Sequence, residues 1–214
     1  MKRLAAMLVV LMILPACKPD KIELELYTSD IQTAAGGEVV EVPCVITFGS
    51  IGDDEDGSIA KAMEAAKKYF PAESEFTMTK GENGKTLTIT SVVPLGTQAA
   101  LEEFLQTRKS PYAIVLRGTG LYPEGTEQLG LYNKELEDLG VSFTIEALAG
   151  SSLFKIVGDM KTAPEVSAMA VFVDGKPELT FRRKIARRES VLLDFRGGDD
   201  SVYSGIPIQM TVVF

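Results

Sequence analysis

The chain has 214 residues, of which 45% are hydrophobic and 24% are charged, and its formal net charge at pH 7 is −8. This composition is typical of a globular protein and excludes a disordered chain. The negative charge argues against binding to nucleic acid, because phosphates would repel the chain. There is no histidine, which excludes zinc sites built on histidine and nucleophiles activated by it.

The first residues have the pattern of a secretory signal. A basic start, Lys2-Arg3, precedes the apolar run Leu4–Ile13, which is too short to span a membrane. The run ends in Leu14-Pro15-Ala16-Cys17, which resembles the lipobox of bacterial lipoproteins. The resemblance implies that residues 1–16 are removed as a signal peptide. It also implies that Cys17 is lipidated, so that the membrane is a partner of the mature chain.

The residues after the cysteine indicate where the mature chain is held. Lys18 stands where an aspartate retains enterobacterial lipoproteins in the inner membrane. We therefore expect an outer-membrane lipoprotein of the cell envelope that faces the periplasm, with the inner membrane as the alternative. Residues 17–21 form the lipidated tether, and four extended residues reach on the order of 13 Å. The folded body must lie close to the membrane.

Residues 22–118 are predicted to form an α+β domain. Alternating hydrophobicity predicts strands, and helical periodicity with capping signals predicts two helices between them. The expected strands are 22–26, 39–48, 76–80, 85–90 and 112–116, and the expected helices are 58–70 and 97–108. The resulting element order is ββαββαβ. Cys44 lies on the apolar face of the second strand, so we expect a buried, unreactive thiol.

Residues 119–214 are predicted to form a mostly antiparallel, β-sandwich-like domain. Helical periodicity nearly disappears here, apart from a single helical turn at 134–139. Strand-like runs follow one another, and Asp174-Gly175 has the sequence of a tight hairpin turn. The expected strands are 141–148, 153–157, 166–173, 178–185, 191–195 and 206–214.

A cluster of cations interrupts this acidic chain between positions 182 and 188. Its members are Arg182, Arg183, Lys184, Arg187 and Arg188. Guanidinium groups bind phosphates and carboxylates through paired hydrogen bonds, so the cluster is a candidate site for an anionic partner, either lipid phosphates or an acidic surface. The simpler alternative is a solvated strand end, since runs of charge are usually exposed to water.

Acidic residues supply two further candidates. Asp53, Asp54 and Asp56 form a weak candidate calcium site, because Gly52 and Met63 stand where a calcium loop requires acids. Asp53, Asp56, Asp199 and Asp200 are candidates for the carboxylate pair that glycosidases use. No motif for a cofactor is intact, so we expect no cofactor and no other metal site.

Three short segments carry a second resemblance. They are Leu26-Tyr27-Thr28-Ser29-Asp30-Ile31, Lys68-Tyr69-Phe70-Pro71 and residues 170–177. Together they are similar to small lipoproteins of unknown function that are encoded by phages and prophages of Gram-negative bacteria. The resemblance implies a phage-encoded envelope lipoprotein and supplies no site residues.

These observations favour a non-enzymatic, membrane-anchored protein that binds an envelope partner on the periplasmic side. A phage-encoded version would exclude superinfecting phages or modify the envelope. Two alternatives stay open at this point. One is an enzyme that acts on envelope glycan or lipid through carboxylates, and the other is a structural subunit of an envelope or phage assembly.

Overall fold

The computed structural model describes residues 21–49, 57–81, 84–141, 144–145, 152–195 and 210–214. In these residues the protein is a mixed α+β structure with four helices and a larger share of strand. No helix among them reaches the length and hydrophobicity that crossing a membrane requires.

Helices are interspersed with strands up to residue 138, and after that point the described elements are strands. In chain order they are β1 (Lys21–Tyr27), α1 (Thr28–Ala35), β2 (Val40–Gly49), α2 (Ser58–Tyr69), β3 (Glu75–Gly81), β4 (Gly84–Thr97), α3 (Gln98–Phe104), β5 (Tyr112–Arg117), β6 (Gly120–Gly125), α4 (Glu127–Asp138), β7 (Ser152–Val157), β8 (Glu165–Val173), β9 (Lys176–Lys184), β10 (Ser190–Asp194) and β11 (Met210–Val213).

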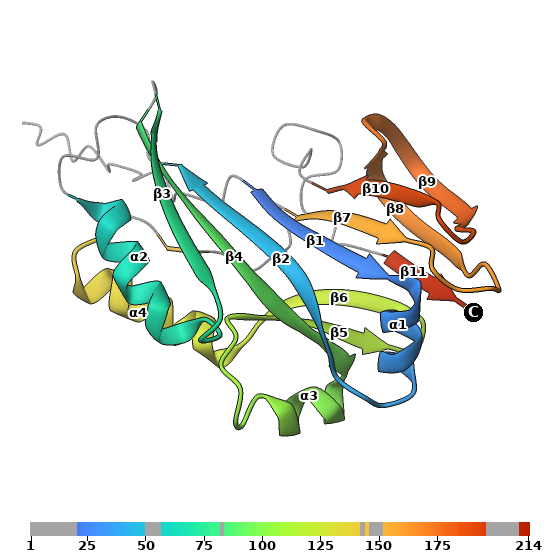
Figure 1. Cartoon of the computed structure of the whole chain (residues 1–214), viewed down its shortest axis with the longest axis horizontal. Coiled ribbons are helices and arrows are strands. Elements are labelled where there is room, and N and C mark those ends of the chain that lie inside the picture. The colour runs from blue at the N-terminus through green and yellow to red at the C-terminus, as the bar shows by residue number, and fades with distance from the viewer. Residues whose placement is uncertain (1–20, 50–56, 82–83, 142–143, 146–151, 196–209) are drawn as a thin grey trace, which may run out of the picture.

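The strands form one sheet whose path returns on itself (Figure 1). The order is β10-β7-β1-β2-β4-β5-β6-β11-β8-β9, with β3 paired to β4. An additional pairing joins β10, at one end of the path, to β8, the strand before the other end. Neighbours are antiparallel except for β1 with β7 and β4 with β5, which are parallel. Strands after residue 119 therefore belong to the same hydrogen-bonded sheet as strands before it.

Strand β8 changes its partner along one edge. Residues 165–168 pair with β11, whereas Phe172 and Val173 pair with β10. Between these segments Ala170 has a φ of 50°, in the left-handed region that alanine rarely adopts. The kink at Ala170 redirects the strand from one partner to the other and so allows the sheet to close.

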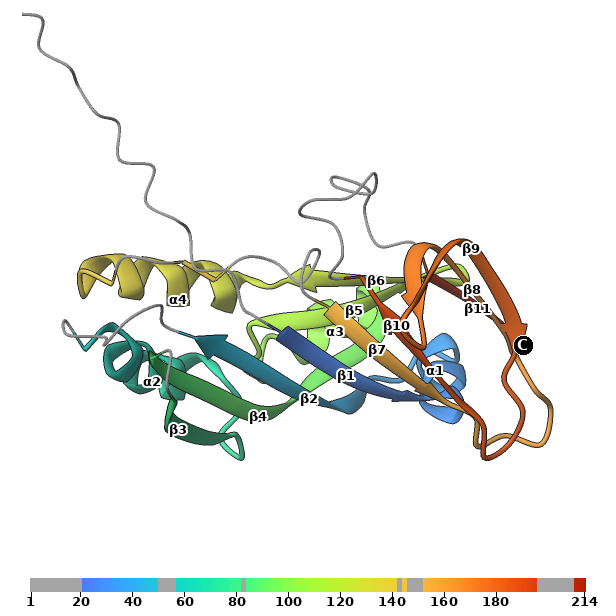
Figure 2. The same cartoon turned by 90° about the horizontal axis from the view of Figure 1, so that it is seen from above.

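Apolar side chains fill the enclosed space. On β1, Ile22, Leu24 and Leu26 are buried, as the alternating pattern predicts. The prediction that Cys44 is buried is likewise confirmed, since its exposed fraction is 1%. Helix α1 contacts β1, β2 and β4 and contributes Ile31 to the core. The packed pair α2 and α4 lies at the opposite end of the long axis (Figure 2).

Helix α1 receives its N-terminal cap from a distant loop. Tyr27 precedes the helix and makes no side-chain hydrogen bond that caps it. Instead, Asp159 accepts hydrogen bonds from the Thr28 hydroxyl at 2.8 Å and from the Ser29 peptide nitrogen at 3.0 Å. Because free N–H groups at the start of a helix need acceptors, Asp159 stabilises α1 from outside its own segment.

The predicted order ββαββαβ is not confirmed, because α1 lies between β1 and β2 and makes the order βαβαββαβ. Residues 28–35 begin with Thr28, Ser29 and Asp30 and are followed by Gly36 and Gly37, which are typical of helix ends. The helix has only eight residues, so its apolar periodicity is too short to reveal it. The predicted helix at 97–108 is shorter in the structure, since α3 ends at Phe104.

The second half also differs from the prediction. Helix α4 covers Glu127–Asp138 rather than a single turn at 134–139, and its buried Leu129, Tyr132 and Leu136 have helical spacing. Gly130 within the helix lowers its intrinsic helix propensity and weakened that signal. Strand β6 was not predicted, and the described residues of the predicted strand 141–148, namely Val141 and 144–145, are not in a strand.

Candidate functional site

Several predicted site residues lie outside the described part of the chain. They are the lipidation residue Cys17, the calcium candidates Asp53, Asp54 and Asp56, and the further carboxylates Asp199 and Asp200. Among the residues that are described, no group of three or more cysteine, aspartate and glutamate side chains is placed to hold a metal ion.

The predicted cationic cluster is divided between β9 and the turn that follows it. The Arg182 Nε donates to Glu165 on the neighbouring strand β8 at 2.6 Å. The Arg183 guanidinium donates to the Ser190 carbonyl at 3.1 Å. These two cations thus bind within the protein, and Lys184 is exposed at the end of β9.

The turn formed by residues 185–189 holds Arg187 and Arg188 out into solvent. The Arg188 N–H donates to the Gly158 carbonyl at 2.7 Å, and the Gly158 N–H donates to the Glu189 carbonyl at 2.8 Å. Arg188 has a φ of 72°, an unfavourable conformation that the docked turn maintains. Neither arginine side chain has an ion-pair partner among the described residues. The turn therefore holds the backbone of Arg187 and Arg188 in place, and it leaves both guanidinium groups without an ion-pair partner in the described part of the chain.

A groove lies between α3 and the junction of β6 with α4, with a volume of about 350 Å³. Its two walls come from different parts of the chain, and its floor is the outward face of β5. The polar residues that line the walls are Gln98, Glu102 and Gln106 on one side and Glu124, Glu127 and Gln128 on the other.

The floor of the groove is apolar. Ala113 and Val115 of β5 form a small buried cluster with Leu101 of α3, and Leu105 packs against it. The alternate residues of β5, such as Ile114, face the main core. Strand β5 is therefore covered on both faces, and α3 lies over its outer face.

Arg117 closes one end of the groove. Its guanidinium donates to the Gln98 side-chain oxygen on α3 at 3.1 Å and pairs with the Glu124 carboxylate on β6. The guanidinium carbon lies 5.4 Å from the centre of the Tyr122 ring, within the range of a cation–π contact. The hydrogen bond to Glu124 raises the pKa of Arg117 above its usual value. Arg117 thus bridges the two walls.

Thr126 closes the other end. Its N–H donates to the Pro111 carbonyl at 2.9 Å, and its hydroxyl donates to the Ser110 carbonyl. The same hydroxyl accepts the Gln128 N–H at 3.2 Å, as the N-cap of α4. These bonds fix the first turn of α4 against the segment that precedes β5.

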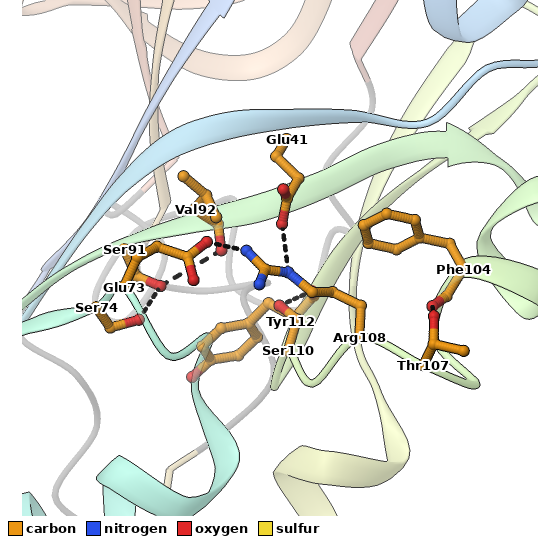
Figure 3. A network of polar contacts seen from close by, with 10 residues as sticks. All are labelled: Glu41, Glu73, Ser74, Ser91, Val92, Phe104, Thr107, Arg108, Ser110 and Tyr112. Atoms are coloured by element: carbon orange, nitrogen blue, oxygen red, sulfur yellow. Dashed lines mark hydrogen bonds and ion pairs between the residues drawn. The ribbon is translucent and has the colours of Figure 1, made fainter.

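Arg108, just beyond α3, ties this region to the rest of the sheet (Figure 3). Its Nε donates to Glu41 of β2 at 2.8 Å, and another guanidinium nitrogen pairs with Glu73 in the turn before β3. Beside this pair the Ser74 and Ser91 hydroxyl oxygens are 2.8 Å apart, which links the turn to β4. The C-terminal end of the α3 wall is held in place by this network.

The groove combines its apolar floor with an acidic rim. Glu124 is paired with Arg117, and Glu102 accepts a hydrogen bond from Gln98 at 2.9 Å. The Glu127 carboxylate makes no hydrogen bond or ion pair with any other described residue. Such an arrangement suits a ligand with an apolar stem and a positively charged head, because burial of the stem and ion pairing occur together.

Sequence reasoning did not find the groove because its residues come from three separate segments, 98–106, 113–115 and 124–128. One signal was present in the continuous apolar run Tyr112–Leu116. A strand that is apolar on both faces needs cover on both sides, which predicts a packed element over β5. It does not predict the acidic rim.

Comparisons with protein-family models, with curated proteins and with solved structures find no match to this chain. The groove and the basic turn are therefore interpreted from the chemistry of their own residues. Their charges differ in sign, so they select different partners.

Proposed function

We propose that the protein is a lipoprotein anchored through Cys17 in the outer membrane, that it faces the periplasm, and that it binds an envelope partner without catalysis. The lipobox Leu14-Pro15-Ala16-Cys17 supports the anchor, and Lys18 supports the outer membrane. The resemblance to phage and prophage lipoproteins supports a role in superinfection exclusion or envelope modification.

The observation that carries this proposal is the distance between the tether and the groove along the sheet. Lys21 pairs with Thr47 of β2, and Thr47 pairs with Thr88 of β4. The groove lies beside the far end of β4, where Leu95 pairs with Ile114 of β5. The strand from Thr88 to Leu95 spans roughly 23 Å at about 3.3 Å per residue. A chain tethered at Lys21 is thus able to present the groove away from its anchor.

The basic turn also lies far from the tether. Tyr27 at the end of β1 pairs with Val157, and the next residue, Gly158, holds the turn that carries Arg187 and Arg188. Strand β1 spans roughly 20 Å. This position favours an acidic partner surface over the head groups of the anchoring membrane.

Palmitate labelling tests the anchor. Wild-type protein should incorporate the label and fractionate with the outer membrane, whereas Cys17→Ala should incorporate none. Lys18→Asp should keep the label and move to the inner-membrane fraction. Unchanged labelling of Cys17→Ala would contradict the anchor.

Plating of phages on cells that express the gene alone tests the binding role. We expect reduced plating of some phages and recovery with Arg187→Ala combined with Arg188→Asn, since asparagine tolerates the left-handed conformation of residue 188. Lys134→Ala, an exposed cation of α4, is the matched control and should leave the reduction unchanged. Normal plating across a broad panel would count against exclusion.

We also propose that residues 22–118 and 119–214 fold as two domains. The pairs β1–β7 and β5–β6 join the two parts by hydrogen bonds. Limited proteolysis near Gly118 should release two stable fragments if the parts are separate domains. If the protease does not cut near Gly118 and the intact chain unfolds in a single cooperative transition, the two parts form one folding unit.

A further inference from the structure

The groove between α3 and the start of α4 has the features of a site for one amphipathic side chain. Its floor is apolar: Leu101, Ala113 and Val115 are nearly buried, with exposed fractions of 2%, 3% and 4%, and the partly buried Leu105 packs against them. Its rim places Glu102 on one wall and Glu127 on the other. A lysine side chain is complementary to this groove, because its methylene stem can pack on the apolar floor while its ammonium stays at the acidic rim.

We propose that this groove binds a lysine side chain that a partner protein presents beside an aliphatic residue. The inference rests on the proposed binding role and names the chemistry of the partner. It does not depend on lipidation of Cys17.

The charges of the groove select a cation. Glu102, Glu124 and Glu127 line it, and Arg117 offsets the charge of Glu124 through their ion pair. Glu102 accepts a hydrogen bond from the uncharged Gln98 amide and so keeps its net charge, as does Glu127. A compact ammonium carries three donors on a flexible stem and adapts to carboxylates in different directions, whereas the planar guanidinium of arginine prefers one carboxylate in its own plane.

The closed ends of the groove restrict how the partner enters. Arg117 bridges the walls at one end through Gln98 and Glu124, and Thr126 is bonded to Ser110 at the other. A continuous chain therefore cannot run through the groove along its length without breaking these contacts. The partner must insert side chains from the open face, which fits a volume of about 350 Å³, at the small end of ligand sites.

The apolar floor favours a protein segment over a free polyamine. Leu105, one helical turn from the buried Leu101, keeps apolar surface that a partner can cover. A neighbouring aliphatic side chain would cover this surface. Polyamines carry charges along their whole length and would place one of them on this apolar surface, which is unfavourable.

The test measures binding of a short fluorescein-labelled peptide that alternates leucine and lysine, by fluorescence anisotropy, to the full-length protein purified in detergent. The control peptide is identical except that its lysines are acetylated, which removes the charge and keeps the length. We expect the unmodified peptide to bind and the acetylated peptide not to bind. Binding should weaken as ionic strength rises from about 0.05 M to about 0.5 M.

Two matched double variants locate the site. Glu102→Gln with Glu127→Gln removes the rim charges, and Glu103→Gln with Glu137→Gln removes neighbouring exposed charges of the same helices outside the groove. The first should weaken binding by about tenfold, because it removes two exposed ion pairs and each contributes about threefold to the affinity. The second should leave the affinity unchanged. If the first double variant fails to fold, Gln106→Lys adds a positive charge at an exposed position of the groove and should weaken binding likewise.

Equal binding of the two peptides, or equal loss in the two double variants, would overturn the proposal. Displacement of the peptide by spermidine at equal concentration would assign the groove to small amines and would also overturn it. Palmitate labelling is unaffected by any of these results. A failure of the groove proposal is therefore distinguishable from a failure of the proposed anchor.

Discussion

Asp159 accepts a hydrogen bond from Thr28 at 2.8 Å across 131 residues of sequence. Thr28 is fully buried at the start of α1, directly after β1. Asp159 follows β7, the parallel neighbour of β1. The contact therefore joins two chain segments that leave the same end of the sheet, and it fixes the helix that contributes to the core there.

Replacing this cap should destabilise the protein. We expect Asp159→Ala to lower the free energy of unfolding by about 1 kcal/mol, because the N–H of Ser29 and the hydroxyl of Thr28 lose their acceptor. Urea unfolding followed by circular dichroism measures the change. Asp138→Ala, at the exposed C-terminal end of α4, is the control and should not destabilise, since an acid there opposes the helix dipole. Equal losses in both variants would contradict the capping role.

The Asp159 carboxylate should also make the free energy of unfolding depend on pH. Burial alone would raise the pKa of Asp159, but hydrogen bonds from Ser29 and Thr28 outweigh it and hold the pKa below the usual 3.8. The folded state thus favours the charged form, so the contribution is present above the unfolded pKa and is lost as pH falls through the folded pKa. The stability difference between wild type and Asp159→Asn should be constant above about pH 5 and shrink below about pH 4. A difference that persists at lower pH would exclude a role for the charge.

Gly158 should not tolerate a side chain. A Cβ atom there would overlap the carbonyl group of Ala186, which belongs to the backbone and cannot move aside without displacing the basic turn. We expect Gly158→Ala to destabilise by on the order of 2 kcal/mol. The matched control is Gly130→Ala in α4, where a Cβ meets open space. That variant should stabilise by about 0.5 to 1 kcal/mol. Thermal unfolding of both variants gives the comparison.

Arg108 and Glu41 should be energetically coupled. A double-mutant cycle of Arg108→Ala and Glu41→Gln isolates the interaction of the two side chains, which are 2.8 Å apart and about one-third exposed or less. We expect a coupling free energy of about 0.5 to 1 kcal/mol. The pair Arg182 and Glu165 is the control, because the Arg182 side chain is 74% exposed and solvent weakens its ion pair. A larger coupling in the control pair would contradict the role of the Arg108 network.

The Cys44 thiol should be unreactive in the folded protein. Burial, with a smaller effect of the Glu23 charge, raises its pKa above the usual 9.0, so little reactive thiolate forms. Alkylation by iodoacetamide should be at least about a hundredfold slower in native protein than in urea, because it requires unfolding. Peptide mapping by mass spectrometry distinguishes Cys44 from Cys17. Rapid native alkylation of Cys44 would show that its strand opens locally.

Local patterns predicted elements whose signals lie within one segment. The alternation of Ile22, Leu24 and Leu26 predicted β1, and the helical periodicity of residues 58–70 predicted α2. Helix α1 was missed because it has only eight residues and one of its stabilising contacts, Asp159, lies far along the chain. The basic cluster was recognised as a unit, but Arg182 and Arg183 bind within the protein. Only contacts with β8 and β10 distinguish them from Arg187 and Arg188.

The sequence by itself determined the secretory pattern, the residue proposed for lipidation, the acidic charge and most strands, because each depends on neighbouring residues. The tertiary structure decided the closure of the sheet, the cap of α1 and the groove, because each joins segments that are distant in sequence. No local pattern specifies that β8 meets β10 after the kink at Ala170. Likewise, Glu102 and Glu127 become parts of one acidic rim only because α3 and the start of α4 lie on opposite sides of the same groove.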